Sequence, residues 1–130
     1  MDDQVTLFTK IINREIPAEI IYEDELCIAF RDINAQAPLH ALLVPKQVLT
    51  KLSDGTQQDQ SLLGHLMLTA PLIAEQQGYA DAFRVVINNG EAAGQTVFHL
   101  HIHIIAGREL SWPPGSDPYT KIGLSIARAA

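Results

Sequence analysis

The sequence predicts an α+β domain with a mainly antiparallel sheet of about five strands, one short N-terminal helix and one long helix. A length of 130 residues fits a single domain. Hydrophobic residues make up 47% of the chain and charged residues 18%, which is typical of a folded globular protein. Helical periodicity occurs in two places only, and the other apolar stretches are short and bounded by turn residues. The expected order is helix, three strands, long helix, two strands.

The first helix is predicted from apolar residues at helical spacing over positions 7–12. Thr6 is the expected N-cap, and Pro17 should end the helix near Ile16.

Three strands are predicted next. Residues 19–22 and 26–30 form the arms of an expected hairpin that turns at Asp24, and residues 41–44 form a short buried strand that Pro45 ends.

A long helix follows, because apolar side chains line one face from residue 62 to residue 74. Thr56 and Asp59 have the spacing of a capping box at its start, and Gly78 is the expected stop. Pro71 should kink this helix, since proline removes a backbone donor.

Charge and cysteine content exclude several classes of protein. Nine Lys and Arg against fifteen Asp and Glu give a net charge of -6, which disfavours sequence-independent binding to nucleic acid. No apolar run approaches the ~18 residues that span a bilayer, so no membrane is expected. The single cysteine, Cys27, has apolar neighbours and is expected to be a buried, inert thiol. A reducing compartment, the cytoplasm, is the expected location.

The candidate functional residues lie on the last two predicted strands, at 84–87 and 96–106. Alternation with a period of two places His99, His101 and His103 on one face of the second strand, ~6.6 Å apart along its axis. Apolar residues occupy the other face.

Three interpretations of this histidine row remain open. The row could be structural, or it could hold a metal, although three ligands in line do not converge easily on one ion. The third interpretation is a nucleophilic histidine flanked by two supporting ones, because imidazole attacks phosphorus well and titrates near neutrality. The third is favoured, since the loop between Gly90 and Gly94 offers backbone donors for phosphate oxygens.

The sequence also resembles a known family over nearly its whole length, from about Leu7 to Gly115. Residues 99–105 match the pattern His-φ-His-φ-His-φ-φ, where φ is apolar, of the histidine-triad (HIT) family. The other matching stretches are 8–12, 16–18, 29–33, 36–40, 43–46, 94–97 and 112–115. The closing Trp-Pro-Pro-Gly resembles the Hint branch, the histidine-triad nucleotide-binding proteins, more than the dinucleoside polyphosphate hydrolases. The resemblance implies a HIT-like fold, with a single HIT domain over 1–130, its core at about 5–115 and a C-terminal tail at 116–130.

The resemblance implies a role for each matching residue. His101 would be the nucleophile, and His99 and His103 would orient the site and donate to phosphate oxygens. Thr96, at a position usually held by Ser, would contact the leaving group. The expected phosphate-binding residues are Asn88, Gly94, Thr96, His101 and His103.

The nucleoside site is implied in the same way. Asp32 would bind the ribose hydroxyls, although it could instead cap its loop. His40 would orient the nucleophile. The apolar base pocket would consist of Phe8, Ile11, Ile16, Phe30, Ile33 and Leu42, most of which would be core residues under almost any fold.

The implied activity is that of a purine nucleoside phosphoramidate hydrolase. The nucleophile would form a nucleotidyl-histidine, and water would release the nucleoside 5′-monophosphate. Expected partners are AMP, GMP and their phosphoramidates, together with a second copy of the chain; no cofactor or metal is expected. His103, rather than the Gln of related nucleotidyl transferases, favours water as the acceptor. The alternatives are a non-catalytic module that binds nucleotides or a partner protein, and a zinc-binding protein.

Overall fold

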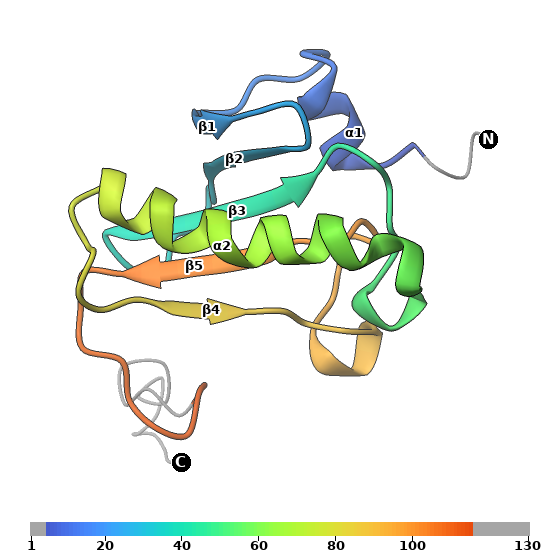
Figure 1. The fold of residues 1–130 in the computed structure, drawn as a ribbon. Coiled ribbons are helices and arrows are strands. Elements are labelled where there is room, and N and C mark those ends of the chain that lie inside the picture. The colour runs from blue at the N-terminus through green and yellow to red at the C-terminus, as the bar shows by residue number, and fades with distance from the viewer. Residues whose placement is uncertain (1–4, 116–130) are drawn as a thin grey trace.

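The computed structural model describes residues 5–115, and the expected tail at 116–130 lies outside them. Five strands form one sheet in the order β1-β2-β3-β5-β4, with every neighbouring pair antiparallel. The long helix α2 crosses one face of this sheet, and the short helix α1 lies beside β1 and β2 (Figure 1). The elements are α1 (Leu7–Ile12), β1 (Ile20–Glu23), β2 (Cys27–Arg31), β3 (Leu39–Pro45), α2 (Gln60–Gln76), β4 (Arg84–Val86) and β5 (Ile102–Ala106). The predicted fold class is confirmed.

Helix α1 begins as predicted and ends early. Thr6 is its N-cap, and the Thr6 side chain accepts a hydrogen bond from the backbone N–H of Thr9. The helix ends at Ile12 rather than near Ile16, because Arg14 adopts a left-handed conformation with φ of 63°.

Helix α2 has the predicted capping box. Thr56 and Asp59 make both reciprocal hydrogen bonds around a short 3₁₀ turn, and the α-helix follows from Gln60. Pro71 lies on an exposed position inside the helix, which continues to Gln76. Gly78 follows with φ of 95°, a conformation suited to glycine.

The two faces of the sheet pack into two separate cores. Alternate residues of β2 and β3, such as Ala29 and Leu43, face α2 in the larger core. The residues between them, such as Phe30 and Leu42, face α1 in the smaller core, together with Phe8. This second face carries the candidate site.

The predicted strand over 96–106 is wrong in its first half. Strand β5 contains only Ile102–Ala106, and residues 96–101 are irregular. The segment before Ile102 is not a strand because it has no paired neighbour among residues 5–115. The last residue pair between β5 and β3 is Ile102 with Leu43, and the last pair between β5 and β4 is His103 with Val86. The three histidines therefore do not form a straight row on a strand.

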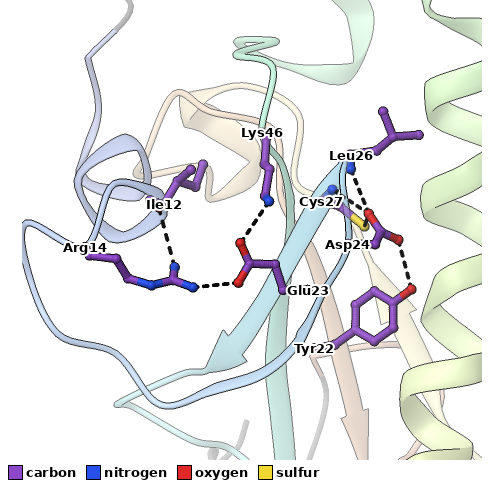
Figure 2. A network of polar contacts seen from close by, with 8 residues as sticks. All are labelled: Ile12, Arg14, Tyr22, Glu23, Asp24, Leu26, Cys27 and Lys46. Carbon is purple, nitrogen blue, oxygen red and sulfur yellow. Dashed lines mark hydrogen bonds and ion pairs between the residues drawn. The ribbon is translucent and has the colours of Figure 1, made fainter.

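Polar contacts fasten the loop after α1 to the sheet (Figure 2). Glu23 accepts from Arg14 at 2.5 Å and from Lys46 at 2.8 Å. The neighbouring Asp24 accepts from the backbone amide of Leu26 at 2.8 Å, which closes the predicted hairpin turn.

The prediction for Cys27 is confirmed. Its side chain is fully buried, and burial raises the pKa of the thiol to about 12, so the thiol is protonated and inert at neutral pH. Within residues 5–115, no helix is long and apolar enough to cross a membrane.

Candidate active site

A cavity of about 920 Å³ lies between α1 and the face of the sheet that α2 leaves uncovered. Its apolar lining includes all six predicted base-pocket residues: Phe8, Ile11, Ile16, Phe30, Ile33 and Leu42. Its polar lining includes seven other predicted site residues: Asp32, His40, Asn88, Gly94, Thr96, His101 and His103. Of the predicted set, only His99 does not line the cavity.

The ring of His101 is fixed by a backbone carbonyl. Its Nδ1 lies 2.8 Å from the carbonyl oxygen of His99, and because a carbonyl only accepts, Nδ1 carries the proton. Nε2 of a neutral ring then has a free lone pair. Burial lowers the pKa of His101, which keeps the ring neutral at pH 7. Phe8 packs edge-on against this ring, with centroids 5.0 Å apart.

His99 lies beneath the cavity as a support. It is fully buried, and its Nε2 donates to the carbonyl oxygen of Pro45 at 2.8 Å. Its Nδ1 therefore accepts from the hydroxyl of Thr6 at 2.8 Å. Both ring nitrogens are occupied, so the expectation that His99 donates to phosphate oxygens is wrong. The geometry suits only its expected orienting role.

His40 and His103 form a relay that begins at a backbone amide. The N–H of Gln36 donates to Nδ1 of His40 at 3.0 Å, so the proton of neutral His40 is on Nε2. That Nε2 donates to Nδ1 of His103 at 2.9 Å. His103 consequently carries its own proton on Nε2. Burial lowers its pKa to about 4, so at neutral pH His103 is an uncharged N–H donor.

The loop before the histidines is held by Gln95, whose role the sequence analysis missed. Its side chain is 2% exposed; Oε1 accepts from the backbone N–H of Gly90 at 2.8 Å, and Nε2 donates to the carbonyl oxygen of Thr50 at 2.8 Å. Gly90 and Gly94 have φ of 94° and 100°, which favour glycine. The signal available in the sequence was a glutamine near two glycines. Neither its burial nor its hydrogen-bond partners can be predicted from the sequence.

Asp32 caps its loop, and its carboxylate also lines the cavity. One oxygen accepts from the backbone N–H of Asn34 at 2.8 Å and caps the loop. The other lies 3.4 Å from Nε2 of His40, on the side of the cavity.

The apolar end of the cavity is a slot beside α1. Phe8 and Phe30 meet edge to face with centroids 5.5 Å apart, and Leu42 is 8% exposed. These side chains also belong to the smaller core. Ile33 is 95% exposed and lies at the rim.

Two groups of side chains in residues 5–115 have donor atoms close enough for a metal. In the cavity, Asp32, His40 and His103 place one donor atom each within 4.8 Å of the others, but both nitrogens of His40 and Nδ1 of His103 are already hydrogen-bonded. Elsewhere, Cys27 and His65 lie beside Asp24, which already accepts hydrogen bonds from His65 and from backbone amides. A metal at either place would have to replace these hydrogen bonds, so neither group fits one as it stands.

Comparisons with known proteins agree with the geometry. The HIT domain family model matches residues 13–110. An uncharacterized HIT-like protein of Synechocystis is 61% identical over 110 residues, which are 85% of this chain and 96% of the relative. Adenylylsulfatase HINT1 of Arabidopsis thaliana is 48% identical over 115 residues, 87% of this chain and 78% of that protein.

The fold agrees as well. The crystal structure of a HIT family hydrolase from Legionella pneumophila superposes with a TM-score of 0.83 at 39% identity, covering 85% of this chain and all of that one. Sequence and structure together show that the chain belongs to the histidine-triad (HIT) family.

Proposed function

We propose that the protein hydrolyses purine nucleoside 5′-phosphoramidates through a nucleotidyl-histidine intermediate on His101. The observation that carries this proposal is the hydrogen bond from Nδ1 of His101 to the carbonyl of His99, which leaves Nε2 as a nucleophile in a cavity with an apolar slot. The family membership and the relative named adenylylsulfatase support nucleotidyl transfer to water. The choice of a purine base and of a P–N bond as the bond that is cleaved rests on the resemblance to the Hint branch.

Each wall of the cavity has a task in substrate binding. The base enters the slot between Phe8, Phe30 and Leu42, and the oxygen of Asp32 that does not cap the loop accepts from a ribose hydroxyl. The α-phosphate then lies beside Asn88, the backbone of Gly94 and the N–H of His103. Neutral donors around the phosphate stabilise the charge that develops on its oxygens.

The reaction takes two displacements at phosphorus. Nε2 of His101 forms a bond to phosphorus while the bond to the leaving nitrogen breaks. That nitrogen leaves as an amine after it takes a proton from solvent, passed on by the hydroxyl of the exposed Thr96. The carbonyl of His99 stabilises the resulting imidazolium through Nδ1–H. Water then attacks phosphorus and releases one proton to solvent, the bond between Nε2 and phosphorus breaks, and the nucleoside monophosphate leaves with neutral His101 restored.

The test compares turnover of adenosine 5′-phosphoramidate by the wild type, His101→Ala and His65→Ala. Loss of the nucleophile should lower kcat by at least about 1,000-fold. His65 lies outside the cavity and bonds Asp24, so its variant controls for the loss of a histidine and should retain full rate. Full activity in His101→Ala would refute the nucleophile assignment.

The same assay separates the alternatives. A wild type that binds AMP in calorimetry but turns over neither adenosine 5′-phosphoramidate nor adenylyl sulfate would be a non-catalytic nucleotide-binding module. Turnover of adenylyl sulfate alone would move the reaction from P–N to P–O bonds. Hydrolysis that stops on chelation and returns with zinc would favour the metal alternative.

We also propose that the protein is a homodimer in the cytoplasm. Leu68 and Leu72 are 77% and 41% exposed on the outer side of α2, where Gly64 leaves open space. Neighbouring exposed apolar side chains of this kind are typical of an interface. The reduced, buried Cys27 fits a reducing compartment.

A further inference from the structure

A second cavity, of about 490 Å³, adjoins the candidate active site. The two cavities share Gln36 and Asn88 in their linings. The second one lies over β4 and β5 and is closed by the segment that follows β5. Because Asn88 is one of the proposed phosphate contacts and lines both cavities, the second cavity is next to the proposed position of the α-phosphate.

The second cavity is positively charged in an acidic protein. Among residues 5–115, Arg84 and Arg108 line it and no carboxylate does, although the chain as a whole has a net charge of -6. Arg108 donates to the carbonyl oxygens of Gln36 at 2.7 Å and Glu109 at 2.9 Å, so its guanidinium forms part of the wall.

Arg84 is held differently from the arginines elsewhere. Within residues 5–115, its half-buried guanidinium makes one long hydrogen bond, 3.5 Å to the carbonyl oxygen of Leu110, and no ion pair. By contrast, Arg14 pairs with Glu23 and Arg31 pairs with Glu19. A guanidinium has five N–H donors, so most of those on Arg84 remain available to a ligand.

The strand register places Arg84 on the catalytic face. Val86 is opposite His103, and Arg84 is opposite Ile105 two residues farther along β5. Cross-strand partners share a face, and the side chains two residues apart are separated by ~6.6 Å along the strand. Arg84 therefore lies beyond His103, while the base slot lies on the other side, toward α1.

We propose that Arg84 binds a carboxylate on the leaving group, so that the protein selects among nucleoside 5′-phosphoramidates by the charge at the far end of the leaving amine. This inference rests on the proposed function. The phosphorus carries the nucleoside on one side, and its remaining substituent leads into the second cavity. A carboxylate a few bonds from the leaving nitrogen reaches past His103, whereas a sulfate bonded directly to the phosphate remains beside Asn88.

The chemistry of the step is that of the parent reaction. The P–N bond breaks, the nitrogen leaves as the protonated amine, and the carboxylate of the leaving group is unchanged. The carboxylate is favoured over other groups because its two oxygens match the planar fork of a guanidinium.

The experiment measures kcat/KM for two adenosine 5′-phosphoramidates, one of β-alanine and one of β-alanine amide. They differ only in the charge of the distal group. The wild type should prefer the acid, and Arg84→Gln should lower the ratio of acid to amide about tenfold, as expected for the loss of a partly solvated charge-assisted hydrogen bond. Arg84→Lys, which retains the charge but not the fork, should give an intermediate ratio.

A charge exchange gives the sharper test. Arg84→Glu should disfavour the β-alanine substrate and favour the phosphoramidate of 1,3-diaminopropane, which carries an ammonium group at a similar distance. Arg14→Gln is the matched control, because Arg14 lies at the loop after α1, outside both cavities, and its variant should keep the wild-type ratios (Figure 2).

The outcomes are distinct. An unchanged ratio in Arg84→Gln, or equal losses on acid and amide, refutes the carboxylate subsite while the proposed hydrolase stands. A wild type that hydrolyses neither substrate nor the unsubstituted phosphoramidate refutes the proposed function, and this inference with it.

Discussion

At the scale of single residues, three backbone groups decide where the protons of four imidazoles lie. Two carbonyls, from His99 and Pro45, can only accept, and one amide, from Gln36, can only donate. Neutral rings then have one consistent arrangement: a lone pair on Nε2 of His101 and an N–H on Nε2 of His103. Four similar side chains thus acquire different chemical capacities from the backbone around them.

Burial of these rings predicts the pH dependence of the reaction. The pKa of His101 is lowered by burial, so the ring keeps its lone pair at pH values where an exposed histidine is protonated. We expect kcat/KM for adenosine 5′-phosphoramidate to stay level as pH falls from 8 through about 6.5, the usual histidine pKa, and to decline only below it. An acid limb centred at or above 6.5 would contradict this expectation.

Unfolding must be separated from this titration. The lowered pKa values of His101 and His103 mean that the unfolded chain binds more protons between about 4 and the ordinary histidine value. Their contribution to stability is therefore complete above about 6.5 and is lost as pH falls toward 4. Near-UV circular dichroism at each pH shows whether the protein remains folded while the rate declines.

At the scale of elements, the N-terminus of α1 is connected to the histidines that we propose are catalytic. Thr6 caps the helix and donates to His99, whose carbonyl fixes His101. The same helix supplies Phe8 to the base slot. In the proposed function, the cap therefore links the nucleoside-binding slot to the orientation of His101.

Replacement of two helix caps tests this connection. Thr6→Val and Thr56→Val each remove a capping hydroxyl, and each should lower the free energy of unfolding by about 1 kcal/mol in urea titrations. Only Thr6→Val should also lower kcat, by about tenfold, because the ring of His99 loses the donor on its Nδ1. Thr6→Ser should restore the rate. If the two valine variants lose activity equally, Thr6 serves stability alone.

The element order and both capping threonines could be predicted from the sequence, because periodicity and capping are local. The residues that line the cavity were predicted from the resemblance to the histidine-triad family. The sequence did not allow the end of β5 to be predicted. Alternation continues through His99 and His101, but the pairing of β5 with β3 and with β4 ends at Ile102 and at His103, and pairing partners are a property of the assembled sheet. The contacts of Gln95 with Thr50 and of His99 with Pro45 span 45 and 54 residues and were invisible for the same reason.

At the scale of the whole molecule, net charge and local charge differ in sign. The chain carries a net charge of -6, yet the proposed phosphate end of the site is lined by neutral histidines and adjoins a cavity with two arginines. The acidic surface disfavours long polyanions, while the cavity suits one small anion. Exclusion of nucleic acid remains a prediction of the overall charge.

Exposed apolar residues on α2 and the edge strand β4 predict that the protein forms a dimer. β4 is an edge strand, and α2 exposes Leu68 and Leu72 beside the open position of Gly64. Burial of Leu68 between two copies would contribute about 1.5–3 kcal/mol, so Leu68→Glu should weaken a dimer by at least about tenfold. Sedimentation velocity should show a dimeric wild type and a largely monomeric variant at micromolar concentration. Leu26→Glu, at a 47% exposed leucine in the β1–β2 turn, is the control and should remain dimeric. A monomeric wild type would refute the proposed dimer. A dimeric Leu68→Glu variant would show that the dimer interface does not include this part of α2.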